Sequence, residues 1–155
     1  RQMCIRDRGC SLALLSCLLP NFLNLFMVGF ASSFSAKLSD TFSSEIGKRF
    51  GKGTFLVTTL KPVPPGTEGA ISIEGSIAGL FGSFIMTVVM LKLSIISGLF
   101  VAFMVFLSGY LATFLESYIG AVVQNKIDWM TNELVNSIQT SIAAIISIFL
   151  CLNYV

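Results

Sequence analysis

The sequence predicts an all-α integral membrane protein, with about four transmembrane helices in this fragment and one polar loop rich in proline and glycine. Only 12% of the 155 residues are charged and 54% are hydrophobic, whereas soluble domains usually carry about 25% charged residues. The mean hydropathy is +0.84. Uncharged runs close to the roughly 20 residues of a membrane-spanning helix recur along the chain.

The first nine residues, RQMCIRDRG, have a charge pattern found nowhere else in the chain. They resemble translated adaptor sequence, so we predict that residues 1–9 are not native. Residues 10–155 are then expected to form a single polytopic membrane domain that is truncated at its N-terminus.

Four uncharged runs and two polar segments follow. The runs cover residues 9–36 (interrupted by Pro20 and Asn21), 75–91, 93–115 and 134–155. Lys92 alone separates the second run from the third, which predicts a tight turn. If four spans alternate, the polar segments 37–74 and 116–133 lie on one side of the membrane and Lys92 lies on the other. The basic residues of the first segment favour the cytoplasmic or stromal side.

A helix is predicted over residues 33–48, where polar side chains recur at helical spacing on one face. The residues of this face are Ser33, Lys37, Asp40, Ser44 and Lys48. Charges at the end of a membrane helix usually line a polar cavity or pair with one another. The alternative is a solvated helix end with ion pairs between successive turns.

The stretch GKRFGKGT approaches a phosphate-binding P-loop but does not match it. Gly47 and Gly51 are too close together, and no strand precedes them. Backbone N–H groups bordered by glycine, beside Lys48, Arg49 and Lys52, nevertheless suit a polyanion.

The stretch LKPVPPGTEGAISIEGS predicts a stiff, non-helical loop. Its prolines favour extended backbone, and Gly66 and Gly69 permit sharp turns. Such backbone near a membrane lines a polar cavity or packs within protein. Glu68 and Glu74 flank the loop and would suit Mg²⁺, with phosphate oxygens completing the coordination.

Small and amide-bearing residues mark the remaining helices. Gly75, Gly79 and Ser83 form a small-residue stripe that indicates close helix packing. Two further polar faces consist of Glu116, Gly120 and Gln124, and of Asn132, Asn136 and Gln139. An amide in an apolar helix needs a partner, either a neighbouring helix or the head group of a ligand.

Several classes of function are excluded. The chain has no histidine, and its four cysteines form no CxxC pair, so histidine catalysis, histidine metal sites and the common zinc and redox motifs are absent. The net charge of +2, without a basic stripe, argues against nucleic-acid binding.

Two long stretches carry a resemblance to a known family, which covers roughly residues 28–150. FSAKLSDTFSSEIGKRFGKGTFLVTTLKPVPPGTEGAISIEGSIAGL and LATFLESYIGAVVQNKIDWMTNELVNSIQT resemble the phytyl-phosphate kinases of plants, algae and cyanobacteria, integral membrane proteins grouped with transmembrane protein 19. Residues 40–76 also resemble a looser pattern of polyprenol kinases, dolichol kinases and CDP-archaeol synthases. The positions that match this pattern are Asp40, Gly47, Lys48, Lys61, Glu74, Gly75 and Ser76.

The resemblance implies transfer of a phosphoryl group from CTP or another nucleoside triphosphate, with Mg²⁺, to phytyl phosphate. The product would be phytyl diphosphate for tocopherol synthesis, made in a plastid or cyanobacterial membrane. The residues predicted to be catalytic are Asp40, Glu45, Lys48, Lys61, Glu74 and Glu116, with Asp40 and Glu74 as metal ligands. Those predicted to bind substrate or nucleotide are Ser44, Gly47, Arg49, Lys52, Gly66, Glu68, Gly69, Gly75, Ser76, Gln124, Asn132 and Asn136.

Two alternatives remain open. One is a CTP-dependent prenol kinase or nucleotidyltransferase that acts on another lipid. The other is a membrane protein without enzymatic activity, such as a transporter or assembly factor.

Overall fold

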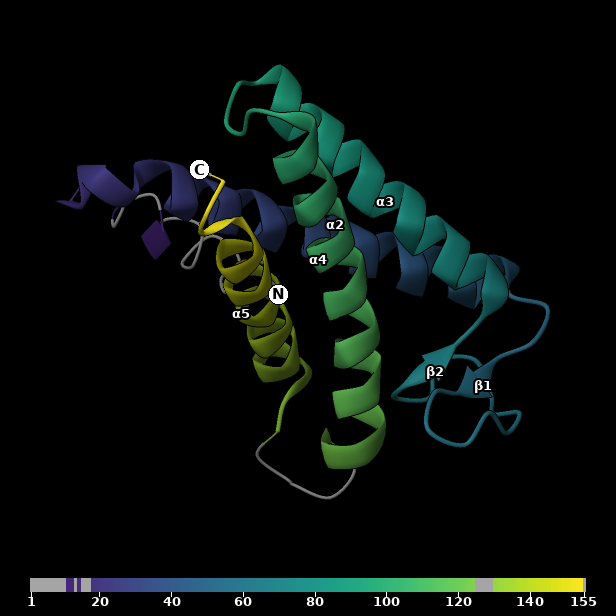
Figure 1. Ribbon diagram of the computed structural model, residues 1–155. Coiled ribbons are helices and arrows are strands. Elements are labelled where there is room, and N and C mark those ends of the chain that lie inside the picture. Colours follow the sequence, from purple (N-terminus) through teal and green to yellow (C-terminus); the bar gives the residue numbers. More distant parts are fainter. Residues whose placement is uncertain (1–10, 13, 15–17, 125–129, 155) are drawn as a thin grey trace.

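The computed structural model describes residues 11–12, 14, 18–124 and 130–154 (Figure 1). The predicted segment 1–9 lies outside these residues. The helices are α2 (Leu23–Phe50), α3 (Ile73–Lys92), α4 (Leu99–Ile119) and α5 (Asn132–Cys151), with a 3-10 turn at Pro20–Phe22 and a π-helical turn at Gly120–Gln124. The strands are β1 (Phe55–Leu56) and β2 (Ala70–Ile71). The predicted all-α fold with one polar loop is confirmed.

Three of the described helices are long and apolar enough to cross a membrane. They correspond to Ile73–Lys92, Leu99–Val123 and Asn132–Cys151, and they match the second, third and fourth uncharged runs. The first run does not form a separate span among the described residues. Its end is continuous with the polar face, in the single 28-residue helix α2. The arrangement is therefore three candidate spans and one long, polar-ended helix, where the run count predicted about four spans.

α2 is longer at both ends than the helix predicted over residues 33–48. Pro20 occupies the first turn of the preceding 3-10 helix, where its missing N–H costs nothing, and the chain runs directly on into α2. The helix ends at Phe50, and the next residue, Gly51, has an extended backbone. Lys48 and Arg49 lie in the last turn, where positive charge interacts favourably with the helix dipole.

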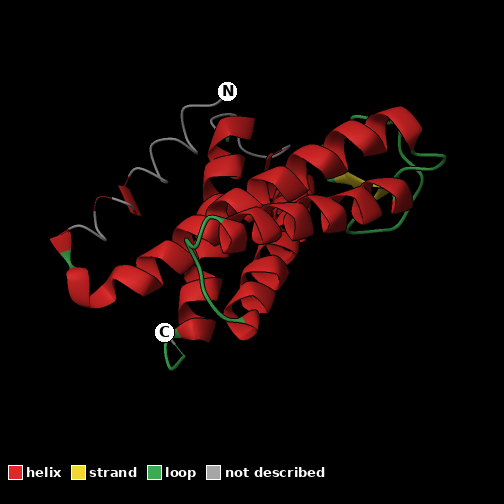
Figure 2. Cartoon of the chain, turned by 90° about the horizontal axis from the view of Figure 1, so that it is seen from above, coloured by secondary structure: helices red, strands yellow, loops and turns green. Residues whose placement is uncertain are grey.

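α2 is the element on which the other helices pack. In Figure 1, α4 and α5 cross it steeply while α3 lies along it, and the view in Figure 2 agrees. A Cβ on Gly75 would lie 2.7 Å from the carbonyl oxygen of Ser43, and one on Gly79 would lie 3.2 Å from that of Ser39. The small-residue stripe of α3 therefore lets the two backbones touch, as its spacing predicted.

The loop between α2 and α3 folds back on itself and docks on the end of α4. β1 pairs antiparallel with β2, with Phe55 opposite Ile71. Gly66 and Gly69 have φ of +90° and +75°, a region that favours glycine. A side chain on Gly69 would also collide with Ala121, because its Cβ would lie 2.4 Å from that of Ala121.

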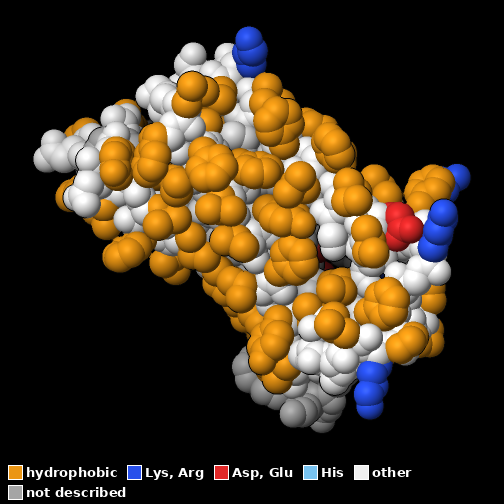
Figure 3. All heavy atoms as spheres, turned by 45° about the vertical axis from the view of Figure 1, so that its right-hand side comes forward, with side chains coloured by type: hydrophobic (Ala, Val, Ile, Leu, Met, Phe, Trp, Pro, Cys, Tyr) orange, Lys and Arg blue, Asp and Glu red, His pale blue; other side chains and the backbone are white. Residues whose placement is uncertain are grey.

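Hydrophobic side chains dominate the outer surface of the helices on the face drawn in Figure 3. Most charged side chains visible there lie toward the end that carries the loop. This distribution suits helices surrounded by lipid, with a polar region at one end.

Candidate functional site

A polar cavity of about 690 Å³ opens where the loop meets the helices. α2 contributes residues between Phe34 and Lys48, and the loop contributes Thr54 and residues 66–72. α4 contributes Thr113, Glu116 and Ser117, and α5 contributes Asn132, Glu133 and Asn136. Both polar segments of the sequence therefore meet in one site, as the alternation of spans predicted.

The cavity wall contains eleven of the residues predicted for the site. They are Asp40, Ser44, Glu45, Gly47, Lys48, Gly66, Glu68, Gly69, Glu116, Asn132 and Asn136. Six others do not line it, and they are Arg49, Lys52, Lys61, Glu74, Gly75 and Ser76. The side chain of Gln124 lies outside the described part of the structure.

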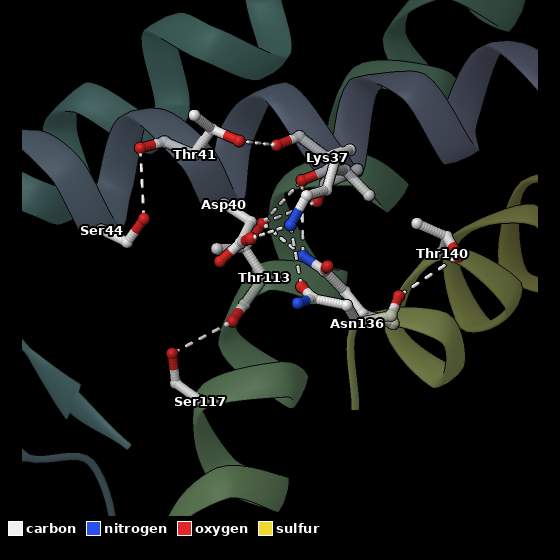
Figure 4. A network of polar contacts seen from close by, with 11 residues as sticks. Lys37, Asp40, Thr41, Ser44, Thr113, Ser117, Asn136 and Thr140 are labelled. Atoms are coloured by element: carbon white, nitrogen blue, oxygen red, sulfur yellow. Dashed lines mark hydrogen bonds and ion pairs between the residues drawn. The ribbon is translucent and has the colours of Figure 1, made fainter. Parts of the chain in front are cut away.

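Lys37 of α2 connects two walls of the cavity. Its Nζ donates to Asp40 Oδ2 at 2.6 Å and to Asn136 Oδ1 of α5 at 2.9 Å. Figure 4 shows the ammonium pointing toward both partners. The Lys37 and Asp40 side chains are only 22% and 14% exposed. The pair is therefore largely shielded from bulk water, so its geometry is set by the protein.

A second set of hydrogen bonds lies next to this pair and joins three helices. Gln139 Nε2 of α5 donates to the Ala36 carbonyl of α2 and to Thr113 Oγ1 of α4, both at 3.3 Å. The predicted amide face of α5 thus has two uses, since Gln139 joins helices while Asn136 and Asn132 line the cavity. These bonds fix α4 and α5 against α2 and hold the cavity walls in place.

The loop brings Glu68 to the same cavity from the opposite side. The docking of Gly69 on Ala121 places the adjacent Glu68 in the cavity wall. Glu116 of α4 interacts electrostatically with Asp40, Lys37 and Glu68. Three carboxylates from three different elements therefore lie in the same part of the cavity as the Lys37 ammonium group.

The predicted metal ligand Glu74 has a different environment. It lies in the first turn of α3, where its Oε1 accepts the backbone N–H of Lys52 at 3.4 Å. Gly75 lies against the backbone of Ser43 and Gly47, and the Arg49 guanidinium lies 5.6 Å from the Phe50 ring centre. These residues surround the helix junction beside the cavity, whereas Lys61 is exposed on the loop.

Sequence reasoning missed several lining residues. Lys37 belongs to the predicted polar face of α2, but it was not assigned a role in the site. Thr113 and Ser117 lie one turn apart on α4, on either side of Glu116 in sequence, and this spacing was the available signal. Their hydroxyls line the cavity while also bonding to carbonyls of the preceding turn.

The charges of the wall determine what it can bind. Among the described residues it carries five carboxylates, Asp40, Glu45, Glu68, Glu116 and Glu133, and two lysines, Lys37 and Lys48. Excess negative charge repels a free polyphosphate but favours one that arrives with a divalent cation. Within the described part of the chain, no three histidine, cysteine or acidic residues are grouped so that protein alone could hold a metal. Phosphate oxygens would have to complete the shell.

An apolar groove of about 380 Å³ adjoins the polar cavity. It is lined by Phe55 and Leu60 of the loop, by Ile73, Ser76, Ile77 and Leu80 of α3, and by Tyr110 of α4. Ile71 and Ser72 form part of both walls. One amphiphilic molecule could therefore place a charged head in the cavity and an apolar chain in the groove.

Comparison with known proteins agrees with a membrane protein of this type. The chain is 50% identical over 121 residues to the uncharacterized membrane protein sll0875 of Synechocystis, with 78% of the chain and 46% of that protein covered. It is 47% identical over 131 residues to the protein VTE6, chloroplastic, of Arabidopsis thaliana, covering 83% of the chain and 39% of that protein.

A more distant relative is the uncharacterized membrane protein MJ0933 of Methanocaldococcus jannaschii, 32% identical over 127 residues, with 82% of the chain and 52% of that protein covered. The chain thus spans about half or less of the length of these relatives. No solved structure matches significantly. Residues 8–144 match the family described as Integral membrane protein DUF92, so the chain belongs to this family of integral membrane proteins.

Proposed function

We propose that the chain is part of a kinase that transfers a phosphoryl group from CTP or another nucleoside triphosphate to a membrane-bound isoprenoid monophosphate such as phytyl phosphate. The observation that carries this proposal is the polar cavity, which gathers acids and lysines from both polar segments. Phosphoryl transfer requires mainly positioning and charge neutralisation. A monophosphate is largely doubly ionised at neutral pH, so it is a nucleophile without a histidine base.

The apolar groove supports a lipid acceptor. It shares Ile71 and Ser72 with the polar cavity, so it lies next to the place proposed for the phosphate and offers a neighbouring apolar surface for the hydrocarbon chain. Ile73 and Ile77 of α3 are exposed in this groove, and they offer a hydrocarbon chain an apolar wall for van der Waals contact.

The composition of the cavity wall also supports a requirement for Mg²⁺. Mg²⁺ with a nucleotide commonly takes one or two protein carboxylates and completes its shell with phosphate oxygens and water. Asp40 and Glu116 line the same cavity and would supply such carboxylates, and Mg²⁺ would neutralise charge on the phosphates. Glu74, the other predicted ligand, would have to reach the ion from the neighbouring helix junction.

The relatives support the proposed location. The Arabidopsis protein is named as chloroplastic, and the Synechocystis protein comes from a cyanobacterium. Together with the resemblance to phytyl-phosphate kinases, these names favour a plastid or cyanobacterial membrane and a role in tocopherol synthesis.

The test uses the chain within a full-length version, produced in membranes. Phytyl phosphate and Mg²⁺ are supplied with CTP, ATP, GTP or UTP labelled at the γ-phosphate, and labelled phytyl diphosphate is measured. We expect label from at least one nucleotide and none after chelation of the metal. Absence of label with every nucleotide, in protein shown to be folded, would overturn the proposal and favour a role without catalysis.

A second candidate is a prenol kinase, and Glu116 is the observation that favours it. An alcohol acceptor needs a general base, and the carboxylate of Glu116 lies in the cavity wall close to Asp40. Phytol and phytyl phosphate supplied separately distinguish the two reactions, because only the prenol kinase converts the free alcohol.

A further inference from the structure

Lys37 is the cation at the inner end of the cavity. Among the described residues, two lysines line the wall. Lys48 is exposed in the last turn of α2, whereas the side chain of Lys37 is 22% exposed. Lys48 lies eleven positions after Lys37 in the helix, which corresponds to about 16 Å along the axis. A small anionic group can therefore contact one of these lysines without contacting the other.

The ammonium of Lys37 is oriented before any ligand arrives. It has three N–H donors, and bonds to Asp40 and Asn136 direct two of them. Asn136 holds the ammonium from α5, on the opposite wall from α2 (Figure 4). A lysine held in this way has already lost much of its rotamer freedom, so binding an anion costs less entropy.

Joining α2 to α5 does not explain this arrangement. Other hydrogen bonds already join the two helices, since Ser33 Oγ donates to the Thr140 carbonyl at 3.1 Å and Gln139 Nε2 donates to Ala36. A partly buried ion pair also often adds little net stability, because desolvation offsets the attraction. A charged pair placed in the wall of a cavity is better explained by a ligand.

We propose that Lys37 binds the phosphate of the anionic ligand, that Asp40 competes with that phosphate for the ammonium, and that Asn136 is a positioning residue for it. The identity of the ligand as a lipid phosphate or nucleotide rests on the proposed function, but the competition does not. In the ligand-free state Asp40 holds Lys37. A divalent cation in the cavity would be held by carboxylates such as Asp40, and this would free the Lys37 ammonium for the phosphate while Asn136 would still hold it.

If Asp40 competes with the phosphate for Lys37, removing the Asp40 carboxylate should strengthen phosphate binding in the absence of metal. Phytyl monophosphate is titrated in EDTA into the full-length protein in nanodiscs, with neutral phytol as the ligand control. Asp40→Asn removes the competitor, so we expect phytyl monophosphate to bind about 10- to 100-fold more tightly, the range for one hydrogen bond to a charged group. The affinity for phytol stays unchanged.

Two double variants identify the group responsible, and thermal unfolding confirms that each is folded. Asp40→Asn with Lys37→Met removes the pair together, so no carboxylate is left without its partner, and we expect the gain in affinity to disappear. Asp40→Asn with Lys92→Met has the same net charge, and Lys92 ends α3 outside the cavity wall, so we expect the gain to remain.

Three results would overturn the inference. The first is an unchanged affinity in Asp40→Asn. The second is an equal loss of the gain in affinity when Lys37→Met or Lys92→Met is combined with Asp40→Asn. Such a result would show an effect of net charge alone. The third is full loss of the gain in affinity in the double variant Asp40→Asn with Lys48→Met. This result would place the phosphate at Lys48 instead of Lys37.

Failure of the proposed kinase activity gives a different pattern. Lys37-dependent binding of phytyl monophosphate without transfer from any nucleotide would overturn the kinase and leave the role of Lys37 intact. Transfer by the wild type, with phosphate affinity independent of Lys37, would overturn this inference alone.

Discussion

At the scale of residues, the polar face of α2 was predictable but its partners were not. The spacing of Lys37, Asp40, Ser44 and Lys48 places them on one side of a helix, and all four line the cavity. The partner Asn136 lies 99 residues further along the chain. No local pattern indicates a contact that depends on how α5 packs against α2.

The first residue-scale prediction concerns Asp40 as a metal ligand of the proposed kinase. Asp40→Asn keeps the size of the side chain but loses the charge that attracts a cation and the Lys37 ammonium. We expect turnover to fall by about 100-fold and the Mg²⁺ concentration for half-maximal rate to rise. Initial rates measured across a Mg²⁺ series check both expectations.

The control for Asp40 is Thr58→Ala, on the exposed part of the loop outside the cavity wall. Its rate and Mg²⁺ dependence should match those of the wild type. Full turnover by Asp40→Asn at ordinary Mg²⁺ concentrations would exclude Asp40 from the metal site.

At the scale of elements, the small-residue stripe gave the packing of α3, because glycines one turn apart permit backbone contact. The length of α2 was harder to predict, since an uncharged run and a polar run merge within one helix. The π-helical turn Gly120–Gln124 was also not expected. A π-helical turn has more residues per turn than an α-helix, so α-helical periodicity does not extend through residues 120–124.

The element-scale prediction for packing is that Gly75→Ala destabilises the fold. Alanine favours a helix by about 1 kcal/mol relative to glycine, but here its Cβ would lie 2.7 Å from the backbone oxygen of Ser43. Overpacking of this kind typically costs about 1–3 kcal/mol, so we expect a lower free energy of unfolding. Denaturant unfolding in detergent measures it.

Gly53→Ala provides the comparison for Gly75. A Cβ there would lie 3.4 Å from the Phe55 ring, which is ordinary van der Waals contact, so stability should change little. If Gly75→Ala unfolds like the wild type but loses turnover, the glycine serves substrate binding, as the sequence resemblance predicted, and its packing role is wrong.

The second element-scale prediction concerns the apolar groove. Ile77→Trp fills the groove between the loop and α3, so we expect KM to rise about 10-fold for a long-chain isoprenoid phosphate, the effect of losing roughly two buried methylene contacts. A short-chain phosphate should be nearly unaffected, because it ends before this part of the groove. Ile85→Trp, which is exposed on α3 but outside the groove, should affect neither substrate.

Equal changes in KM for long and short chains on Ile77→Trp would argue against the groove as the site of the hydrocarbon chain. Comparing chain lengths is necessary because a structural defect in α3 would impair both substrates alike. The difference between the two substrates therefore reports on the groove itself.

At the scale of the whole molecule, the sequence predicted which polar segments meet, while their side of the membrane stays a prediction. Counting uncharged runs placed the segments 37–74 and 116–133 together, and the structure brings both into one cavity. The number of spans was less predictable, because α2 joins an apolar first half to a polar second half. The first half alone has the composition of a membrane helix. Hydropathy alone could not show that this half belongs to the helix that carries the site.

The orientation of the whole molecule gives the last prediction. Thr58 lies on the loop near the cavity and Ser97 lies in the turn between α3 and α4, and both are exposed. Figure 1 shows these two connections at opposite ends of α3. Thr58→Cys and Ser97→Cys, each introduced into a protein without the native cysteines, should therefore react with a membrane-impermeant maleimide from opposite sides of sealed vesicles.

The basic residues Lys48, Arg49 and Lys52 favour a cytoplasmic or stromal loop, so Thr58→Cys should react from that side. Labelling of both positions from the same side would mean that α3 does not cross the membrane, and the cavity could not then combine a phosphate at the surface with a chain held in the bilayer.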